Sequence, residues 1–498
     1  MRVLIFHGYL LQGTGSNVYN VQLAATLARL GHEVDLVCQE RDPEPLGLPA
    51  GVTVHNPDIG RMLPVYVVDH YDGFDAKQFL ECTDAEIAAY IAANVAAVAE
   101  VAARHRPDVA LANHLVMGPV ILARALPADV PYAVKIHGSA LEYVVKRDPA
   151  RFLPYAREGL ERARAVLVGS LHTATSLWDT LEDSTVVERT RLGPPGVDIE
   201  QFAPRERSEA AGRLAALAHA LERSDATSGG GSFARADAEA GSALTELDPE
   251  HERLVLFVGK LIVSKGVDLL VAAWPLVLAR VPDARLVVVG FGGYRDSLEL
   301  LIAAIAAGDL EAAAEIARVG RAGEGGPESS LTMLAAFLDG LDGARRDAYV
   351  AAGAGLTERL TIVGRLDHEE LAELLPLCDA QVVPSTFPEA FGMVAAEAAA
   401  CGVLPVSAAH SGLQEVTRTL ARSVPPDARE LLSFELGAGA VEQLADRLVR
   451  WLEASPELRS ATRAALVETA RERFSWEGVA RGLLDAAEGR LDALMPPS

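Results

Sequence analysis

Short runs of β-branched and apolar residues alternate along the chain with longer stretches of helical periodicity. The first run covers residues 3–6, a glycine-rich loop covers 8–15, and apolar positions then recur with the spacing of a helix that ends at Gly31. Residues 34–37 form the next apolar run. This order of strand, loop, helix and strand predicts a doubly wound parallel sheet with helices on its faces.

The same alternation continues through two successive series of strands. The first series continues at 108–111, 132–136 and 165–168, and the second comprises 254–258, 285–289, 361–363, 380–383 and 403–406. A chain of 498 residues is too long for one ordinary core. The sequence therefore predicts an α/β protein of two Rossmann-like domains that face each other across a cleft.

A turn-rich segment separates the two series. Residues 193–204 read Gly-Pro-Pro-Gly-Val-Asp-Ile-Glu-Gln-Phe-Ala-Pro, which is typical of a stiff connection. Two other stretches are longer than a connection needs, and we interpret both as insertions, the second of them helical. The expected parts are an N-terminal domain over 1–192, the crossing over 193–204, a C-terminal domain over 205–475, and insertions over about 205–250 and 299–356.

Composition and charge exclude several classes of protein. The net charge is −24, and so acidic a chain repels phosphate backbones, which argues against a nucleic-acid partner. No apolar stretch approaches the ~20 residues of a membrane-spanning helix, although a local basic patch around Lys146 and Arg147 leaves peripheral contact with a membrane open. The four cysteines form no Cys-x-x-Cys pair, which is typical of reduced thiols rather than of disulfides or a zinc site. We expect a cytoplasmic protein, with the inner face of the membrane as an alternative location, and no pattern indicates an oligomeric state.

Open α/β sheets bind ligands at the carboxyl ends of their strands, so the residues after each strand are candidates. Gly13 and Gly15 follow the first strand and open a helix, where backbone N–H groups favour phosphate. The dinucleotide fingerprint G-x-G-x-x-G is incomplete there, and an ordinary tight turn is the alternative. His137 follows the strand at 132–136 beside Gly138, so a side chain that faces the cleft and an ordinary surface or core histidine are both open.

Lys260 and Lys265 lie around the loop after the strand at 254–258. Most of the 45 basic side chains of the chain are arginines. Two lysines in one strand-to-helix loop therefore indicate contact with phosphate. Two chance surface lysines are the alternative. The loop is not a Walker A motif, because G-x-x-x-x-G-K-[ST] is absent.

The segment Pro388-Glu389-Ala390-Phe391-Gly392 runs into a helix that contains Glu397 and ends at Gly402. If the helix begins near Phe391, the two glutamates lie within about 80° of each other around its axis, so both can face one ligand. Carboxylates accept hydrogen bonds from sugar hydroxyls, and free amides at a helix start bind phosphate. The alternative is a capping Glu389 and a solvated Glu397, but the alanines around Glu397 favour a closely packed helix. The residues at the helix start are Phe391, Gly392, Met393 and Val394.

Taken together, these elements resemble the family-4 retaining glycosyltransferases of GT-B fold. The matching elements are Gly196-Val197-Asp198 with Phe202-Ala203-Pro204, Val258-Gly259-Lys260 with Lys265-Gly266, the Glu-x7-Glu motif from Glu389 to Glu397, and Phe474-Ser475-Trp476-Glu477. The resemblance covers roughly 1–205, 252–298 and 357–490, and only the two insertions lie outside it. It implies that the C-terminal helix over 476–495 joins the N-terminal domain.

The resemblance also implies a role for each candidate residue. It places Gly13 and Gly15 near the donor diphosphate, His137 at the transferred sugar, Lys260 and Lys265 on the diphosphate, Glu389 beside the donor sugar, Glu397 on the ribose hydroxyls, and Arg365 in the loop that offers its backbone to the base. Position 260 is lysine where the family usually has arginine, which keeps the charge but loses the bidentate fork.

The reaction implied by the resemblance is transfer of a sugar from a nucleoside-diphosphate donor to a sugar, lipid-linked or small-molecule acceptor, with front-face retention. The N-terminal domain would hold the acceptor, and the C-terminal domain the donor. No metal or further cofactor is implied, and no Asp-x-Asp motif occurs in the chain. A sugar-nucleotide epimerase on the same fold and a catalytically inactive sugar-nucleotide-binding protein stay open as alternatives. An NAD-linked enzyme is disfavoured by the incomplete glycine fingerprint.

Overall fold

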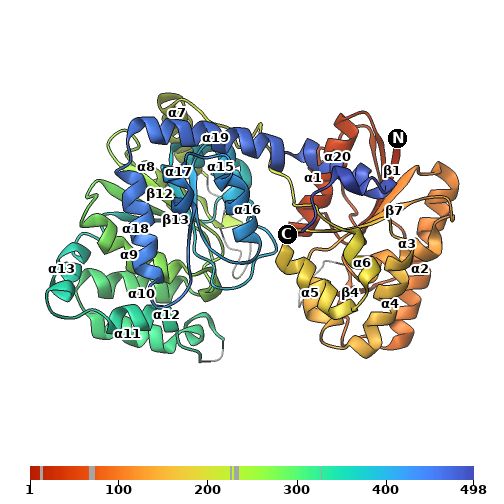
Figure 1. Cartoon of the computed structure of the whole chain (residues 1–498), viewed down its shortest axis with the longest axis horizontal. Helices are drawn as coiled ribbons and strands as arrows, with labels where there is room; N and C mark the ends of the chain where they lie inside the picture. The colour runs from red at the N-terminus through yellow and green to blue at the C-terminus, as the bar shows by residue number, and fades with distance from the viewer. Residues whose placement is uncertain (12–14, 67–72, 225–226, 229–234, 327, 498) are drawn as a thin grey trace. The chain divides into compact units, whose positions relative to one another are not determined.

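The computed structural model describes residues 1–11, 15–66, 73–224, 227–228, 235–326 and 328–497. The chain folds into two compact units, one made of Met1–Gly196 with Phe474–Ser498 and the other of Val197–Arg473. Each unit is built on one large parallel sheet with helices on its faces (Figure 1). The α/β class with two parallel sheets, which the sequence predicts, is confirmed.

Seven parallel strands form the sheet of the unit that contains both chain ends. Their order is β3-β2-β1-β6-β7-β8-β9, so the sheet grows first to one side of β1 and then to the other, as in a doubly wound fold. The strands are β1 (Arg2–Phe6), β2 (Glu33–Val37), β3 (Val52–His55), β6 (Val109–Asn113), β7 (Tyr132–Lys135), β8 (Ala165–Val168) and β9 (Thr190–Leu192). Two short strands, β4 (Met62–Val65) and β5 (Asp75–Gln78), pair separately.

A hydrophobic core covers each face of this sheet. Val3 and Ile5 of β1 belong to one core, and Leu4 and Phe6 belong to the other, because successive side chains of a strand point to opposite faces. Helices α1 and α20 contribute to the first core, and α2, α3 and α4 to the second. The helices of the unit are α1 (Gly15–Arg29), α2 (Asp84–His105), α3 (Gly118–Ala125), α4 (Pro149–Glu161), α5 (Leu171–Leu181), α6 (Ser184–Arg189) and α20 (Trp476–Glu488).

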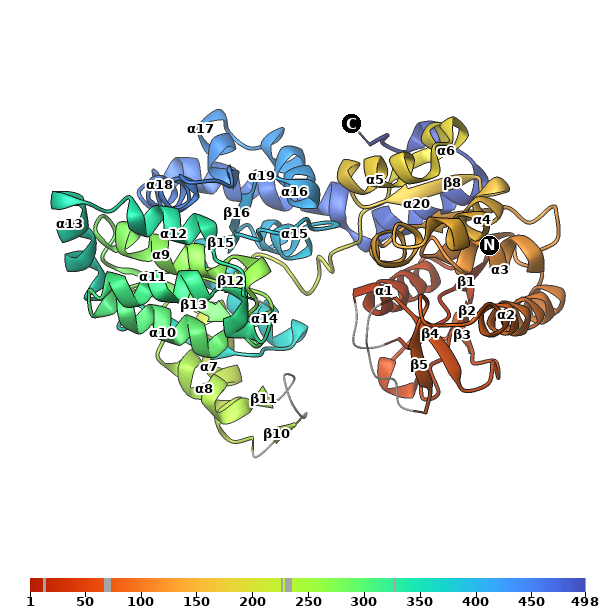
Figure 2. The same ribbon diagram turned by 90° about the horizontal axis from the view of Figure 1, so that it is seen from below.

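Helix α20 packs on the N-terminal unit although it belongs to the far end of the chain (Figure 2). Trp476 at its start contacts Tyr19, with 5.5 Å between the ring centroids. The indole also fills the space beside Gly196, where a Cβ would clash with it. The glycine-proline segment thus lets Trp476 pack against the chain as it leaves this unit.

Helix α2 is long and apolar enough, by length and composition, to cross a membrane, and among the described residues it alone meets that test. Its start is fixed by a capping box between Thr83 and Glu86. Ile87, Val98 and Val101 along it are buried in the core of the unit. Its apolar face therefore has a partner within the fold, as in the core helix of an α/β protein.

The second unit has a sheet of six parallel strands in the order β14-β13-β12-β15-β16-β17. The strands are β12 (Arg253–Val258), β13 (Ala284–Val289), β14 (Leu360–Gly364), β15 (Ala380–Val383), β16 (Leu404–Ala408) and β17 (Ser433–Phe434). The helices around it are α9 (Val267–Leu278), α14 (His368–Leu374), α15 (Met393–Ala400), α16 (Ser411–Ala421), α17 (Pro426–Arg429), α18 (Ala440–Leu452) and α19 (Pro456–Phe474). Loops after β12, β13, β14 and β15 meet at one edge of this sheet, where Lys260, Lys265, Arg365 and Glu389 lie.

Both stretches interpreted as insertions belong to the second unit. Residues 205–250 contain a pair of packed helices, α7 (Arg207–Glu222) and α8 (Asp237–Thr245), joined by the short strands β10 (Thr227–Ser228) and β11 (Arg235–Ala236). The sequence Ser228-Gly-Gly-Gly-Ser232 within this stretch is typical of a loop, and most of it lies outside the described residues. The second insertion is helical, as predicted, and comprises α10 (Arg295–Ala306), α11 (Leu310–Val319), α12 (Thr332–Asp339) and α13 (Gly343–Gly353).

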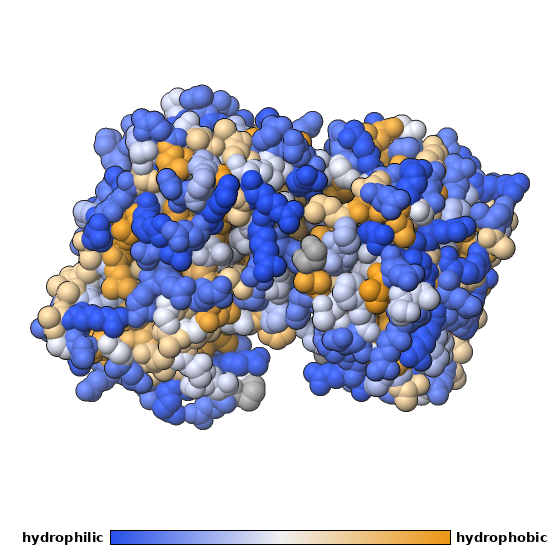
Figure 3. Space-filling view, in the orientation of Figure 1, coloured by the Kyte–Doolittle hydropathy of each residue, from blue (hydrophilic) through white to orange (hydrophobic). Residues whose placement is uncertain are grey.

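Hydrophilic residues dominate the face of the molecule shown in Figure 3, where apolar residues form small, scattered areas. The high net charge of −24 agrees with such a surface. One large apolar side chain at the surface is Phe387, which is 58% exposed and directly precedes the segment from Pro388 to Glu397.

Candidate functional site

The loop between β12 and α9 is fastened to the end of β15. Gly266 has a φ of +67°, and a Cβ at this position would clash with the carbonyl oxygen of Pro384. The carbonyl oxygen of Ser264 accepts a hydrogen bond of 2.9 Å from the backbone N–H of Thr386. Only glycine allows so close an approach with this backbone conformation. The close approach brings Lys265 to the segment that follows β15.

Lys265 forms an ion pair with Glu389 through Nζ and Oε1. The hydroxyl of Ser385 lies 2.8 Å from the same carboxylate oxygen. Both charged side chains are partly exposed, so a ligand can reach them from solvent. The structure thus joins two residues that the sequence singled out separately, and an anionic ligand has to compete with Glu389 for Lys265.

A chain of hydrogen bonds holds the backbone of Glu389. Its N–H donates to Ser411 Oγ at 2.9 Å, Ser411 Oγ lies 3.0 Å from His410 Nδ1, and His410 Nε2 lies 2.7 Å from the carbonyl oxygen of Ser385. Since a carbonyl can only accept, His410 donates through Nε2 and accepts at Nδ1. Ser385, His410 and Ser411 support the predicted glutamate, and the sequence analysis missed all three.

Helix α15 begins at Met393, two positions after the start that the sequence predicts at Phe391. Its start packs closely on α16, because a Cβ at Gly392 would lie 2.9 Å from Leu413 and a Cβ at Gly412 would clash with Phe391. Gly392 is the N-cap residue and has no side chain that could accept from the first amides of the helix. The N–H groups at the start of α15 are therefore available to an anion.

Glu397 is buried in α15, with only 2% of its surface exposed. Its Oε1 lies 2.9 Å from His368 Nε2, and its Oε2 has no hydrogen-bond partner among the described residues. A buried oxygen without a partner costs roughly 1–3 kcal/mol, which a ligand hydroxyl would relieve. The hydrogen bond to Glu397 raises the pKa of His368. The predicted solvent exclusion of Glu397 is confirmed, and His368 is a partner that no motif indicated.

His368 also connects Glu397 with the crossing segment. Its ring packs edge-on against Phe202, with 5.1 Å between the centroids. Phe202 is itself buried and belongs to the Gly-Val-Asp…Phe-Ala-Pro element at the start of the second unit. Two elements that the sequence analysis treated as separate motifs therefore meet through one histidine.

Arg365 follows β14 at the same edge of the sheet as the loop between β12 and α9, which carries Lys260 and Lys265 and is called the lysine loop below. Its guanidinium lies 5.6 Å from the ring centroid of Phe291, and its Nη2 lies 3.2 Å from Asp367 Oδ1. A Cβ at Gly290 would clash with the carbonyl oxygen of Gly259, so the loops after β12 and β13 touch. Arg365, the loop after β13 and the lysine loop are consequently neighbours on one unit.

The helical insertion reaches the lysine loop through Glu324. This residue lies in the turn between α11 and α12, and its Oε2 accepts a hydrogen bond of 2.7 Å from the backbone N–H of Val263. A Cβ at Gly293 would lie 3.1 Å from the carbonyl oxygen of Glu324, so the turn also packs on the loop after β13. Val263 lies between Lys260 and Lys265. The insertion thus supports the loop that carries both predicted lysines.

His137 lies on the other unit, after β7, and begins a directional hydrogen-bond chain. Its Nε2 lies 2.8 Å from Asn113 Oδ1, Asn113 Nδ2 donates to Asn20 Oδ1 at 2.8 Å, and Asn20 Nδ2 lies 3.1 Å from His7 Nδ1. His7 Nε2 continues the chain to Asn17 Oδ1 at 2.9 Å. The amides fix the direction of each bond, so His137 donates through Nε2 and keeps Nδ1 as an acceptor.

Burial lowers the pKa of several titratable groups around His137. Burial lowers the pKa of His137 and of the adjacent His114 well below the usual value, and lowers the pKa of His7 to about 4. Neighbouring imidazoles and Lys135 add to the effect on His137. Burial also lowers the pKa of Lys135 to about 7. At neutral pH, His137 therefore offers a neutral ring that can exchange hydrogen bonds with a hydroxyl.

The structure does not explain why the first loop carries its predicted pair of glycines. Gly15 opens α1, and a Cβ added there would meet no atom within 4 Å, so packing does not require a glycine. Gly13 lies outside the described residues. Of the predicted set, Lys260, Lys265, Glu389, Glu397 and Arg365 belong to the second unit, while Gly15 and His137 belong to the first.

Two family models match the chain. The glycosyl transferase 4-like domain matches residues 14–179, and the glycosyl transferases group 1 model matches residues 245–309 and 346–473. The part of the second unit between those two matched ranges is 310–345, which contains Glu324. Together the two models cover most of both units.

Curated relatives and solved structures span nearly the whole chain. The chain is 26% identical over 479 residues to a D-inositol 3-phosphate glycosyltransferase of Frankia alni, covering 94% of this chain and 93% of that protein. It is 27% identical over 487 residues to the enzyme of the same name from Mycobacterium tuberculosis strain F11, covering 94% and 78%. Its fold is similar to HepE of Anabaena in complex with UDP, with a TM-score of 0.58, 17% identity and coverage of 99% and 100%. It is also similar to sucrose-phosphate synthase of Thermosynechococcus elongatus, with a TM-score of 0.53, 21% identity and coverage of 99% of each chain.

Proposed function

Because the chain belongs to the group 1 glycosyltransferases, we propose that it transfers a sugar from a nucleoside-diphosphate donor to a hydroxyl of an acceptor, with retention of configuration. The observation that carries the proposal is the arrangement around α15. There Glu389 pairs with Lys265, and Glu397 presents a buried oxygen without a hydrogen-bond partner among the described residues. UDP bound to the similar HepE structure supports a nucleotide donor.

Each part of the donor matches a chemical group of the second unit. Oε2 of Glu397 accepts from a ribose hydroxyl, which satisfies the buried carboxylate. The charges of Lys260 and Lys265 and the amides at the start of α15 bind the diphosphate. The loop that carries Arg365 lies beside the base. Glu389 lies beside the sugar once the diphosphate has drawn Lys265 away from it.

The chemistry follows from stabilising the leaving diphosphate. The bond between the anomeric carbon and the diphosphate oxygen breaks, and the acceptor oxygen bonds to that carbon on the same face. The acceptor proton passes to the departing diphosphate. Lys260 and Lys265 stabilise the charge that develops on the diphosphate, and such electrostatic stabilisation is commonly the largest catalytic contribution. Neutral His137 holds a hydroxyl of the transferred sugar.

The proposal assigns the acceptor and the donor to different parts of the chain. Residues 1–192 with 476–495, which contain α20, form the acceptor side, 193–204 form the crossing, and 205–475 form the donor side. The acceptor is a sugar, a lipid-linked molecule or a small molecule, and the names of the curated relatives put inositol phosphates among those to test. The free, buried cysteines support a cytoplasmic location, with peripheral contact at the membrane's inner face for a lipid-linked acceptor.

A thermal-shift screen with UDP-, GDP- and ADP-sugars tests the proposal. A donor that binds the folded protein raises its melting temperature by mass action, and the same donor must not stabilise a Glu397→Ala variant to the same extent. Turnover is then followed with the donor identified and candidate acceptors. Conversion of the donor sugar to an epimer without an acceptor would indicate the epimerase instead. No stabilisation by any donor would overturn the proposal.

A further inference from the structure

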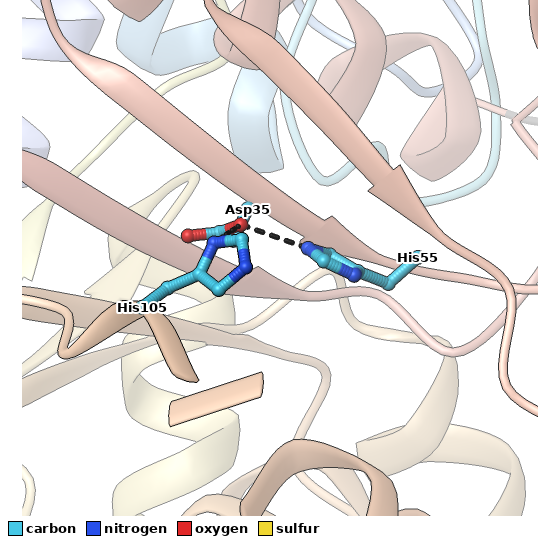
Figure 4. Close-up of side chains that lie close together, drawn as sticks. All are labelled: Asp35, His55 and His105. Atoms are coloured by element: carbon cyan, nitrogen blue, oxygen red, sulfur yellow. Dashed lines mark hydrogen bonds and ion pairs between the residues drawn. The ribbon is translucent and has the colours of Figure 1, made fainter. Parts of the chain in front are cut away.

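Two histidines and an aspartate meet on the N-terminal unit, apart from every residue assigned to sugar transfer. Asp35 comes from β2, His55 ends β3, and His105 ends α2. Figure 4 shows both imidazole rings directed at the carboxylate of Asp35. Three elements that are distant in the sequence thus place one potential metal ligand each at a single point.

The geometry of this group is compact. Oδ1 of Asp35 lies 2.8 Å from His55 Nε2 and 2.8 Å from His105 Nδ1, and the three ligand atoms lie within 4.8 Å of one another. The two rings stand at 78° with 5.4 Å between their centroids. The side chain of Asp35 is only 3% exposed, whereas His55 is 15% and His105 is 25% exposed. The group is therefore closed on the side of the carboxylate and open to solvent on the side of the rings.

We propose that Asp35, His55 and His105 bind a divalent transition-metal cation of the Zn²⁺ class. Imidazole nitrogen and carboxylate oxygen are preferred ligands of such ions, with bonds of about 2.0–2.2 Å. To admit the ion, the nitrogens have to move away from Asp35 by roughly half an ångström, since tetrahedral ligands at those bond lengths lie farther apart than hydrogen-bonded atoms. Rotation of the two partly exposed rings provides this movement. Water fills the remaining position on the open side.

The surroundings of the group favour a cation. Arg2 forms an ion pair with Glu33, and its Nε lies 4.0 Å from Asp35 Oδ2. The single positive charge of Arg2 therefore faces the negative charges of Glu33 and Asp35. A bound cation would neutralise the negative charge that is left over. Arg2 Nη1 also donates to the carbonyl oxygen of His105 at 2.7 Å. This contact fixes the backbone at His105, which carries the third ligand.

A metal bound at this site would link β2, β3 and α2 to one another. Strand β3 is the outermost strand of its sheet and pairs only with β2 within that sheet. A metal bound by His55 and Asp35 joins β3 to β2, and its bond to His105 joins both strands to the end of α2. Metal binding to the folded state alone stabilises that state. The inference does not depend on the proposed sugar transfer, because none of its three ligands has a role there.

Metal binding by the tag-free, full-length protein is the direct test. The protein is treated with a chelator, dialysed, and titrated with Zn²⁺, and bound metal is measured by elemental analysis and calorimetry. Co²⁺ serves as a spectroscopic probe, because its visible absorption reports the coordination geometry. We expect one ion per chain and, at about a hundred times the dissociation constant, a rise in melting temperature of roughly 5–10 °C.

Three variants separate a metal site from a triad held by hydrogen bonds alone. Asp35→Asn keeps an oxygen that can accept from either histidine but loses the ligand charge, and His105→Gln removes one ligand from a partly exposed position. His251→Ala is the matched control, because His251 lies 2.9 Å from Asp248 as an exposed pair on the other unit and belongs to no such three-ligand group among the described residues. We expect both site variants to lose stoichiometric Zn²⁺ and the thermal shift, and the control to keep them.

Each outcome of these experiments either supports or overturns the metal site. Loss of binding in either folded site variant, with binding retained by His251→Ala, supports the site, and circular dichroism establishes that each variant is folded. Absence of stoichiometric Zn²⁺ or Co²⁺ binding by the unaltered protein overturns the proposal. Equal binding by the unaltered protein and by His105→Gln overturns it as well, and leaves the three residues as a hydrogen-bonded triad.

Discussion

Glu397 and His368 share a hydrogen bond of 2.9 Å that occupies one oxygen of a buried carboxylate and leaves the other without a partner among the described residues. His368 is about half-exposed, whereas Glu397 is inaccessible behind it. A ligand that binds Glu397 therefore meets one oxygen that is unsatisfied and one that a movable imidazole already holds. This relationship leads to one prediction about donor binding and one about stability.

Replacing Glu397 by glutamine tests the buried carboxylate. Hydrogen bonds to a charged group contribute about 1.5–3 kcal/mol, so Glu397→Gln should weaken donor binding by roughly tenfold to a hundredfold. Calorimetry with the donor found by the thermal-shift screen measures the change. Glu369→Gln is the control, because Glu369 is an exposed glutamate on the same helix as His368. Equal affinities of Glu397→Gln and the control would remove Glu397 from the donor site.

The pairing with Glu397 also makes stability depend on pH. The pKa of His368 is raised in the folded protein, so its charged form contributes stability that is fully present below the ordinary histidine pKa and is lost as pH rises through the raised value. The difference in melting temperature between wild type and His368→Gln should therefore be largest at acidic pH and shrink above pH ~6.5. Thermal unfolding across this range measures it. A difference that persists unchanged in the Glu397→Gln background would contradict the assignment of the shift to Glu397.

The sequence predicts residues at strand ends well and predicts their supporting partners poorly. Lys265 and Glu389 could be expected at one edge of the sheet, because parallel strands end together, and the structure does join them. Their proposed roles stay predictions. His368 and Glu324 could not be found in the same way, since each acts through a partner 29 or 61 positions away and neither belongs to a motif.

The elements that the sequence analysis missed share a physical reason. Strand β3, with the sequence Val-Thr-Val-His, is short and lies at the sheet edge, so only part of its surface is buried and its pattern is weak. The sequence predicts no helix within residues 205–250, but α7 buries Leu214, Ala218 and Leu221. The helical period was present there, and the many polar residues between the buried positions concealed it.

The ion pair between Lys265 and Glu389 predicts a strong effect on turnover. Lys265→Ala removes the charge proposed to stabilise the leaving diphosphate, and we expect kcat to fall by about 10²–10³-fold. Lys265→Arg keeps the charge and should retain part of the activity, although the geometry of the contact changes. Steady-state kinetics with saturating donor measure both. Lys146→Ala provides a control, because Lys146 is a surface lysine paired with Glu142 on the other unit. Full activity in Lys265→Ala would exclude this residue from the reaction.

From the contact between Glu324 and Val263 we predict that the helical insertion contributes to donor binding without touching the donor. Its carboxylate accepts from the N–H of Val263 at 2.7 Å and so holds the loop between Lys260 and Lys265. Glu324→Ala should release the loop, and small misplacements of a binding group are costly, so we expect the KM for the donor to rise about tenfold while the melting temperature changes little. Glu324→Gln keeps an accepting oxygen and should recover most of the loss. Glu328→Ala is the matched control, since Glu328 is an exposed glutamate of the same insertion that pairs with Arg318. If Glu324→Ala and Glu328→Ala have the same kinetic constants, the contact with Val263 does not position the lysine loop for the donor.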